Sequence, residues 1–132
     1  MRRIDARTGI FFTQGIISET HPQRPAFPTL SINVVRKASL DIQENEAYTL
    51  SINVDKIVLE AETDFGVMHG LETLSPLLVN EETGYFFPKV ELKDSPKFQW
   101  RGLMIDVADH FIPVNAIKRN IHGLAMAAMN IT

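Results

Sequence analysis

KFQWRGLMIDVADHFIPVNAIKRNIHGLAMAAMNIT, residues 97–132, contains a short apolar run, a polar loop and an amphipathic segment, in that order. The run Leu103-Met104-Ile105 is bounded by charge, which is typical of a short strand buried on both faces. A helix is expected from Ile112-Pro113 onward, because proline is tolerated in the first turn of a helix. Its apolar face is formed by Ile117, Ile121, Leu124 and Ala128. A strand, a loop and a helix form the repeating unit of a parallel α/β fold, in which function sits on the loops after the strands.

Composition limits the classes of partner. The 132 residues, 45% of them hydrophobic, suit one domain, or one small domain with a piece of a second. A net charge of −3 gives no basic field for phosphate backbones, so we expect no nucleic-acid partner. No apolar run approaches the roughly 18 residues of a membrane span, and no signal peptide precedes the first elements, which leaves the compartment open. The chain has no cysteine, and its histidines lack metal-ligand spacing, so we expect no metal or other cofactor.

The clearest strand pattern lies at residues 48–54, where apolar side chains alternate strictly with polar ones. Alternation resumes at residues 57–61 after a two-residue step, which predicts an antiparallel hairpin. Two further strands are expected at residues 30–37 and 85–92, and Pro88 places the second at a sheet edge or a bulge.

A helix is expected at residues 64–79. Its predicted buried face is formed by Met68, Leu71, Leu74 and Leu78. Gly66 and Gly70, one turn apart, cost helix propensity and therefore indicate close backbone packing against the sheet. Pro76 is expected to kink this helix or to end it near Ser75.

These elements predict two domains. We expect residues 1–93 to form an α+β domain, an antiparallel sheet with a helix on one face. We also expect this domain to be N-terminally incomplete, because residues 2–7 would supply only the end of a first helix. From residue 94 the pattern changes to parallel α/β, so we place the boundary at residues 94–98. Residues 94–132 hold a single strand–helix unit, which we expect to be the truncated start of a larger domain.

Several motifs occur in an order that indicates one family. EAYTL at residues 46–50 matches a strand motif "E-x-Y-x-L", and GVMHGLETLSPLL at residues 66–78 is similar to a helix motif "G-x-x-x-G-L-x-T-L-x-Q-L". Residues 94–106 look like "D-x-P-R-F-x-x-R-G-x-x-L-D", and residues 111–120 continue the match. Together they resemble glycoside hydrolase family 20, the β-N-acetylhexosaminidases, over nearly the whole chain. The resemblance implies that family's small non-catalytic α+β domain, followed by the first β/α unit of a TIM barrel.

The resemblance also implies an activity. Enzymes of this family remove terminal N-acetylglucosamine or N-acetylgalactosamine with retention of configuration, and the substrate's own acetamido oxygen attacks the anomeric carbon. An adjacent Asp-Glu pair orients the acetamido group and protonates the departing oxygen. No Asp-Glu dipeptide occurs in this sequence. We therefore expect no catalytic residue in this chain and no activity from it alone. A carbohydrate would be its substrate only within a full barrel.

Asp106, Asp109 and His110 are the candidate substrate-binding residues. The family pattern "D-x-x-R-H-F" carries an Arg that binds sugar hydroxyls, and Asp109 stands in its place. An ionised Asp only accepts hydrogen bonds, whereas Arg offers a rigid fork of donors. The alternative for Asp109 and His110 is an exposed loop without substrate contact, and for Asp106 a structural ion pair. Arg101 lies at the start of the predicted strand, so we expect a structural ion pair there.

A second hypothesis comes from a different class of function. The chain would be a decayed relic or a non-enzymatic interaction module, with its exposed strand edge and the apolar face of residues 117–128 buried in a partner or a second copy. Saturable self-association in sedimentation would favour the module, and ill-defined aggregation would favour the truncated enzyme.

Overall fold

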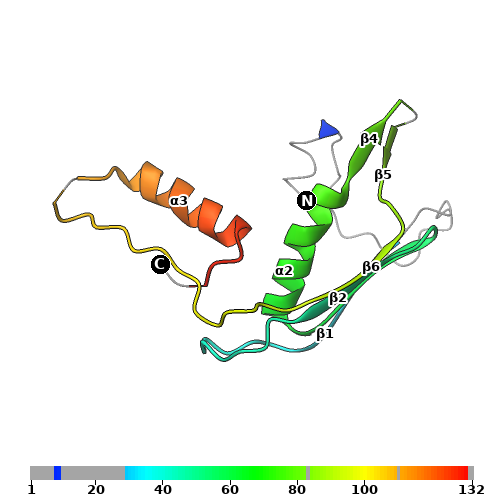
Figure 1. Ribbon diagram of the computed structural model, residues 1–132, viewed down its shortest axis with the longest axis horizontal. Coiled ribbons are helices and arrows are strands. Elements are labelled where there is room, and N and C mark those ends of the chain that lie inside the picture. The colour runs from blue at the N-terminus through cyan, green and yellow to red at the C-terminus, as the bar shows by residue number, and fades with distance from the viewer. Residues whose placement is uncertain (1–7, 10–28, 83, 110, 131–132) are drawn as a thin grey trace, which may run out of the picture.

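A computed structural model describes residues 8–9, 29–82, 84–109 and 111–130 (Figure 1). One helix covers a four-stranded sheet, and a second helix lies apart, beyond a long segment without regular structure. The strands are β1 (Thr29–Arg36), β2 (Tyr48–Ile52), β3 (Lys56–Thr63), β4 (Val79–Glu81), β5 (Gly84–Phe86) and β6 (Val90–Asp94). The helices are α2 (Asp64–Leu74), the 3₁₀ helix η1 (Ser75–Leu77) and α3 (Val114–Met126). The helix end predicted at residues 2–7 lies outside the described residues.

The four-stranded sheet is mixed, with the order β1-β3-β2-β6. β2 runs antiparallel to β3 and to β6, which confirms the predicted hairpin. β1 runs parallel to β3, so the prediction of an antiparallel sheet is wrong for this strand. The reason is the connection at residues 37–47, which is long enough to leave room for β3 between β1 and β2. Alternation predicts a strand, but it does not identify the neighbour.

The core lies between α2 and the two central strands. Its buried hydrophobic residues are Tyr48, Leu50, Ile52, Ile57, Leu59 and Leu74. Leu50 and Leu59 face each other across the β2–β3 ladder, and both are fully buried. The alternating residues of the predicted hairpin therefore form the inner face of the sheet, as expected for strands with one covered face.

α2 approaches the sheet through its glycines. A β-carbon on Gly66 would lie 2.5 Å from the carbonyl oxygen of Ala47, and one on Gly70 would lie 2.2 Å from Cδ1 of Leu59. Both distances are far shorter than any ordinary contact. The close approach at Gly66 therefore requires a residue without a side chain, whereas at Gly70 the Leu59 side chain would have to move. The predicted close packing at these two positions is confirmed.

The predicted apolar face of α2 is only partly correct. Leu74 is buried and Leu78 is half-buried, but Met68 is 58% exposed and Leu71 is 39% exposed. The helix is turned so that Gly66, Gly70 and Leu74 face the sheet, because the glycine stripe gives the closest approach. α2 ends at Leu74 and continues as η1, which confirms the break predicted near Ser75.

The strand predicted at residues 85–92 is divided in two. β5 pairs with β4 in a separate hairpin, whereas β6 pairs with β2 at the edge of the main sheet. Pro88 lies between them and has no N–H to donate to a ladder, so the chain leaves one sheet before it joins the other. The predicted edge position is confirmed for β6. The boundary placed at residues 94–98 stays a prediction.

The strand predicted at residues 103–105 is not formed. Residues 103–105 have no regular structure, and Leu103 is 51% exposed and Met104 92% exposed. A buried parallel strand needs neighbours that satisfy its backbone groups and cover its side chains. No strand of the described residues lies beside this run.

Arg36, at the end of β1, holds the connection after it against the sheet. Its guanidinium donates to both carboxylate oxygens of Glu44, at 2.6 and 3.0 Å, and to Glu62 at 2.9 and 3.0 Å. The backbone N–H and the hydroxyl of Ser39 also donate to Glu44. Arg36 and then Ser39 therefore hold the pKa of the Glu44 carboxyl well below its usual range.

The stabilisation by Glu44 is expected to disappear in acid. The folded state lowers the pKa of this carboxyl, so its contribution is fully present above the ordinary pKa and is lost as pH falls through the folded value. The difference in unfolding free energy between the wild type and Glu44→Gln should therefore be constant near neutral pH and should shrink below the ordinary pKa of 4.5. Urea unfolding at several pH values measures it, with Glu91→Gln on β6 as the exposed control. A constant difference down to about pH 3 would contradict the expectation.

Candidate functional site

The predicted substrate-binding loop is exposed. Asp106 accepts the backbone N–H of Ala108 at 2.7 Å, which is the hydrogen bond of an Asx turn. Asp109 is exposed and has no hydrogen-bond or ion-pair partner in the described part of the chain. His110 lies outside the described residues. Within the described residues no contact joins Asp106 to Asp109, and the substrate-binding role of Asp106, Asp109 and His110 stays a prediction.

Ionisable side chains meet instead at Glu46, just before β2. Oε2 of this carboxylate lies 2.5 Å from Nε2 of His69 on α2 and 2.5 Å from a terminal nitrogen of Arg101. Oε1 accepts the side-chain amide of Asn130 at 3.3 Å. Glu46 is 8% exposed, and a carboxylate buried to this degree is stable only when it is paired and hydrogen-bonded. We call these four residues the Glu46 cluster.

Arg101 is the cation of the Glu46 cluster. Besides Glu46, its guanidinium donates to the carbonyl oxygen of Phe98 at 2.5 Å and to that of Ala128 at 2.7 Å. Each of the three nitrogens thus has an acceptor, which fixes the plane of the group. The structural ion pair predicted for Arg101 is confirmed.

Asn130 links the segment after α3 to the segment before residue 103. Its side-chain oxygen accepts the backbone N–H of Arg101 at 3.0 Å, and its own N–H donates to the carbonyl of Arg101 at 2.9 Å. Its side-chain amide also donates to the carbonyl of Gln99 at 2.7 Å. These hydrogen bonds hold residues 99–101 beside the segment that follows α3, next to Glu46.

The end of α3 delivers Asn130 to this place. The N–H of Met129 donates to the carbonyl of Leu124 and that of Ala128 to the carbonyl of Ala125, which is the pattern of a Schellman motif. Ala128 has a φ of 53°, in the left-handed region that usually favours glycine. This reversal turns the chain toward Arg101, and the carbonyl of Ala128 accepts from its guanidinium.

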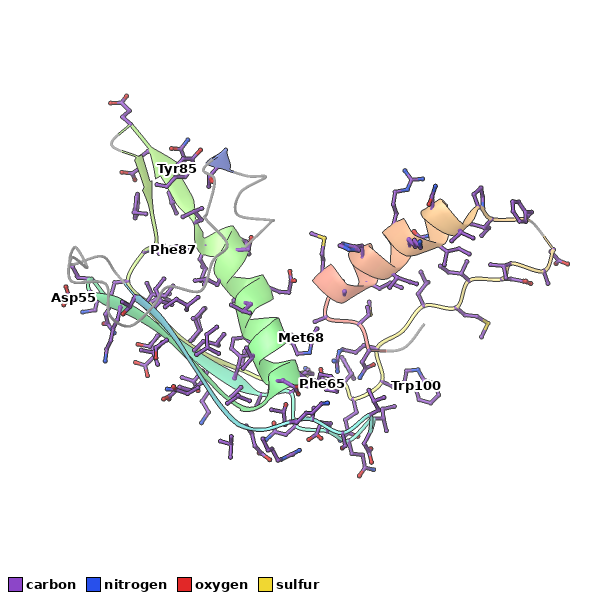
Figure 2. The ribbon with its side chains drawn as sticks, turned by 180° about the vertical axis from the view of Figure 1, so that it is seen from behind. Asp55, Phe65, Met68, Tyr85, Phe87 and Trp100 are labelled. Atoms are coloured by element: carbon purple, nitrogen blue, oxygen red, sulfur yellow. The ribbon has the colours of Figure 1, made fainter. Side chains whose placement is uncertain are left out.

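A cavity of about 380 Å³ opens beside the Glu46 cluster. It is lined by Leu40, Asp41, Ile42, Glu46, Phe65, Met68, His69, Met129 and Asn130. Figure 2 shows Phe65 and Met68 at the end of α2 nearest the segment that carries Trp100. This lining explains why Met68, predicted as a core residue, is exposed instead.

The chemistry of the cluster is that of a structural site. Glu46 is paired with both His69 and Arg101, and no Ser, Thr or Lys is present as a nucleophile among the residues that line the cavity. Within the described residues, no group of His, Cys, Asp and Glu side chains could hold a metal ion. No helix there is long and apolar enough to cross a membrane.

No sequence motif indicates the Glu46 cluster directly. Glu46 appeared only as the first residue of a strand motif, and His69 only as one of several scattered histidines. The one hint is that Glu46 stands two residues before Tyr48, so that alternation places its side chain on the buried face of the strand. The partners lie 23, 55 and 84 residues away along the chain, too far for any local pattern.

Two family models match the chain, one after the other. Residues 6–77 match a model described as "beta-acetyl hexosaminidase like", and residues 98–132 match "Glycosyl hydrolase family 20, catalytic domain". Glu46 and His69 lie in the first match, and Arg101 and Asn130 lie in the second. The Glu46 cluster therefore joins the two matched segments.

Individual relatives agree with these models. Beta-hexosaminidase subunit A1 of Dictyostelium discoideum is 35% identical over 130 residues, which cover 96% of this chain and 24% of that protein. Beta-hexosaminidase subunit alpha of Mus musculus is 36% identical over 92 residues, covering 69% of this chain and 17% of that protein. The solved structure of a Flavobacterium johnsoniae chitobiase is 42% identical, with a TM-score of 0.83 over 97% of this chain and 19% of that one. The chain thus spans about a quarter of the length of these relatives, or less.

Proposed function

The chain belongs to glycoside hydrolase family 20, and from that premise we propose that it supplies the small α+β domain and the entrance to the catalytic barrel of a β-N-acetylhexosaminidase. The succession of the two family matches along one chain carries this proposal. The reaction would be the hydrolysis of terminal N-acetylhexosamine residues with retention, in which the substrate's acetamido oxygen is the nucleophile. The names of the relatives favour this enzyme over the interaction module.

We propose the first β/α unit of a TIM barrel for residues 97–132. The apolar run at residues 103–105 would become its strand once neighbouring strands pair with it. Leu103 and Met104, which are exposed in the described structure, would then be buried. The same neighbours would cover the apolar face of α3, where Ile121 is 49% exposed. These exposed apolar groups support the proposal, because monomeric proteins rarely leave such a surface uncovered.

The loop after this strand would face the substrate. Barrel enzymes carry their sites on the loops at the carboxyl ends of the strands, and residues 106–111 occupy that place. Asp109 would accept hydrogen bonds from sugar hydroxyls, with Asp106 and His110 beside it. The proton transfer itself would belong to an Asp-Glu pair, which this sequence does not contain.

A graft tests the proposal. Residues 1–132 replace the matching segment of the Flavobacterium johnsoniae chitobiase, and hydrolysis of a chromogenic N-acetylglucosaminide is measured. The graft should be active, because the 42% identity and the TM-score of 0.83 predict that the replaced segment has the same backbone course. The chain alone should release no chromophore, because it has no Asp-Glu pair.

Two controls make the assay decisive. The same graft with the Asp-Glu pair of the host removed should be inactive, which assigns any turnover to the barrel. A folded and monodisperse graft without activity would count against the proposal, as would turnover by the chain alone. Self-association through the exposed apolar surface stays a prediction, and sedimentation of the chain at several concentrations measures it.

A further inference from the structure

Glu46 connects three parts of the molecule that are distant in sequence. It precedes β2, and its partners are His69 on α2, Arg101 before the predicted barrel strand and Asn130 after α3. Two of these partners belong to the segment matched by the catalytic-domain model, and Glu46 itself belongs to the other segment. A single carboxylate thus spans the junction between the two matched segments.

The hydrogen-bond partners of Glu46 fit a carboxylate better than a neutral amide. Arg101 and Asn130 each direct an N–H group at the carboxylate, and His69 does the same in the tautomer that carries its proton on Nε2. A carboxylate only accepts. A glutamine amide would place two hydrogens of its own against either Arg101 and His69 or Asn130, whichever way it turned. The guanidinium of Arg101 would lose its anionic partner while the cluster stayed buried, which is unfavourable for a cation.

The position of Arg101 determines the position of the backbone around it. Because its three nitrogens donate to Glu46, Phe98 and Ala128, a shift of the guanidinium moves two carbonyl groups on different segments. Asn130 then pairs with the backbone of Arg101 in both directions. Arg101 lies where the chain enters the predicted strand, and Asn130 lies just after α3. The positions of these two segments are therefore coupled through the carboxylate of Glu46.

We propose that Glu46 is a positioning residue, which fixes the entry to the first barrel strand and the exit from α3 on the α+β domain. The proposal rests on the proposed function for its meaning in catalysis, but the coupling itself is a property of this chain. It would set the register in which the barrel is built, since both ends of the first β/α unit are held from one point.

Hydrogen exchange of the full chain tests the coupling without any assay of activity. The backbone N–H groups of Arg101 and Asn130 report on the hydrogen bonds between these two residues, and those of the β2–β3 ladder report on the sheet. In Glu46→Gln, exchange at Arg101 and Asn130 should be faster by about tenfold or more, equivalent to about 1.4 kcal/mol for the loss of a charge-assisted contact. Exchange in the ladder should be unchanged.

Arg101→Lys provides a second variant if Glu46→Gln does not fold. A lysine keeps the charge but cannot donate in three fixed directions, so it should also accelerate exchange at Asn130 and spare the ladder. Glu91→Gln on β6 is the control for removal of an exposed carboxylate and should change neither group. Equal acceleration of hydrogen exchange at Arg101, at Asn130 and in the β2–β3 ladder would show that Glu46 only stabilises the whole fold. Unchanged exchange at Arg101 and Asn130 would show that Glu46 does not position these two segments. Either result overturns the proposal. An inactive graft would leave this measurement unaffected, so the two proposals fail separately.

Discussion

Gly66→Ala is expected to destabilise the protein by about 2 kcal/mol or more, although alanine is the better helix former. The added β-carbon would lie 2.5 Å from the carbonyl oxygen of Ala47 and 2.9 Å from the β-carbon of Ala61. The first of these atoms belongs to the backbone that leads into β2, so it cannot move without shifting the central strand. Overpacking of this kind outweighs the gain of about 1 kcal/mol in helix propensity.

Urea unfolding followed by circular dichroism measures the change, and Gly123→Ala is the matched control. Gly123 is also within a helix, but a β-carbon there meets nothing within 4 Å. The control should therefore be neutral or more stable, by up to about 1 kcal/mol. Gly70→Ala should fall between the two, because its β-carbon meets the flexible end of the Leu59 side chain at 2.2 Å. Equal stability of Gly66→Ala and Gly123→Ala would show that the close approach of α2 is not required.

The glycines of α2 illustrate what sequence patterns can predict. Two glycines one turn apart are unfavourable in a helix, so their presence indicates a compensating contact, and the structure has that contact at Gly66 and Gly70. Which large side chains are buried was not predictable in the same way. Met68 and Leu71 have helical spacing, but the glycine stripe turns them away from the sheet. Helical spacing of apolar residues predicts that α2 has a buried face, whereas the close contact at the glycines decides which side of the helix faces the sheet.

Sheet order and the Glu46 cluster required the structure. The alternation of residues 30–37 predicts a strand but does not identify its neighbour, and its partner β3 lies beyond β2 along the chain. The cluster depends on contacts across up to 84 residues, which no local pattern contains. The Arg101 ion pair was predictable because of its position at the start of an expected strand, where barrel chemistry does not occur. The acceptor of Arg101 was not predictable, because alternation can place Glu46 on the buried face of a strand but does not identify its partner.

Asp109→Arg is expected to increase kcat/KM of the chitobiase graft by about ten- to a hundredfold. In the family pattern an Arg at this position binds sugar hydroxyls, and Asp109 offers only acceptors in its place. Charged hydrogen bonds of this kind contribute about 1.5–3 kcal/mol, which corresponds to that range of rates. Asp109 is exposed and has no partner in the described part of the chain, so its replacement breaks no described contact.

Steady-state kinetics on a chromogenic N-acetylglucosaminide measure the change, with Asp109→Lys as the matched control. Lysine restores a positive charge without the planar fork of donors, so it should recover much less than arginine if the geometry of the fork matters. An equal gain from both would assign the effect to charge alone. An unchanged kcat/KM in Asp109→Arg would mean that this loop does not face the sugar, and the alternative of an exposed loop without substrate contact would then hold for Asp109 and His110. Because a group that binds the substrate as strongly as the transition state changes only KM, a gain confined to KM would identify a binding role, and a gain in kcat would place the arginine against the reacting sugar.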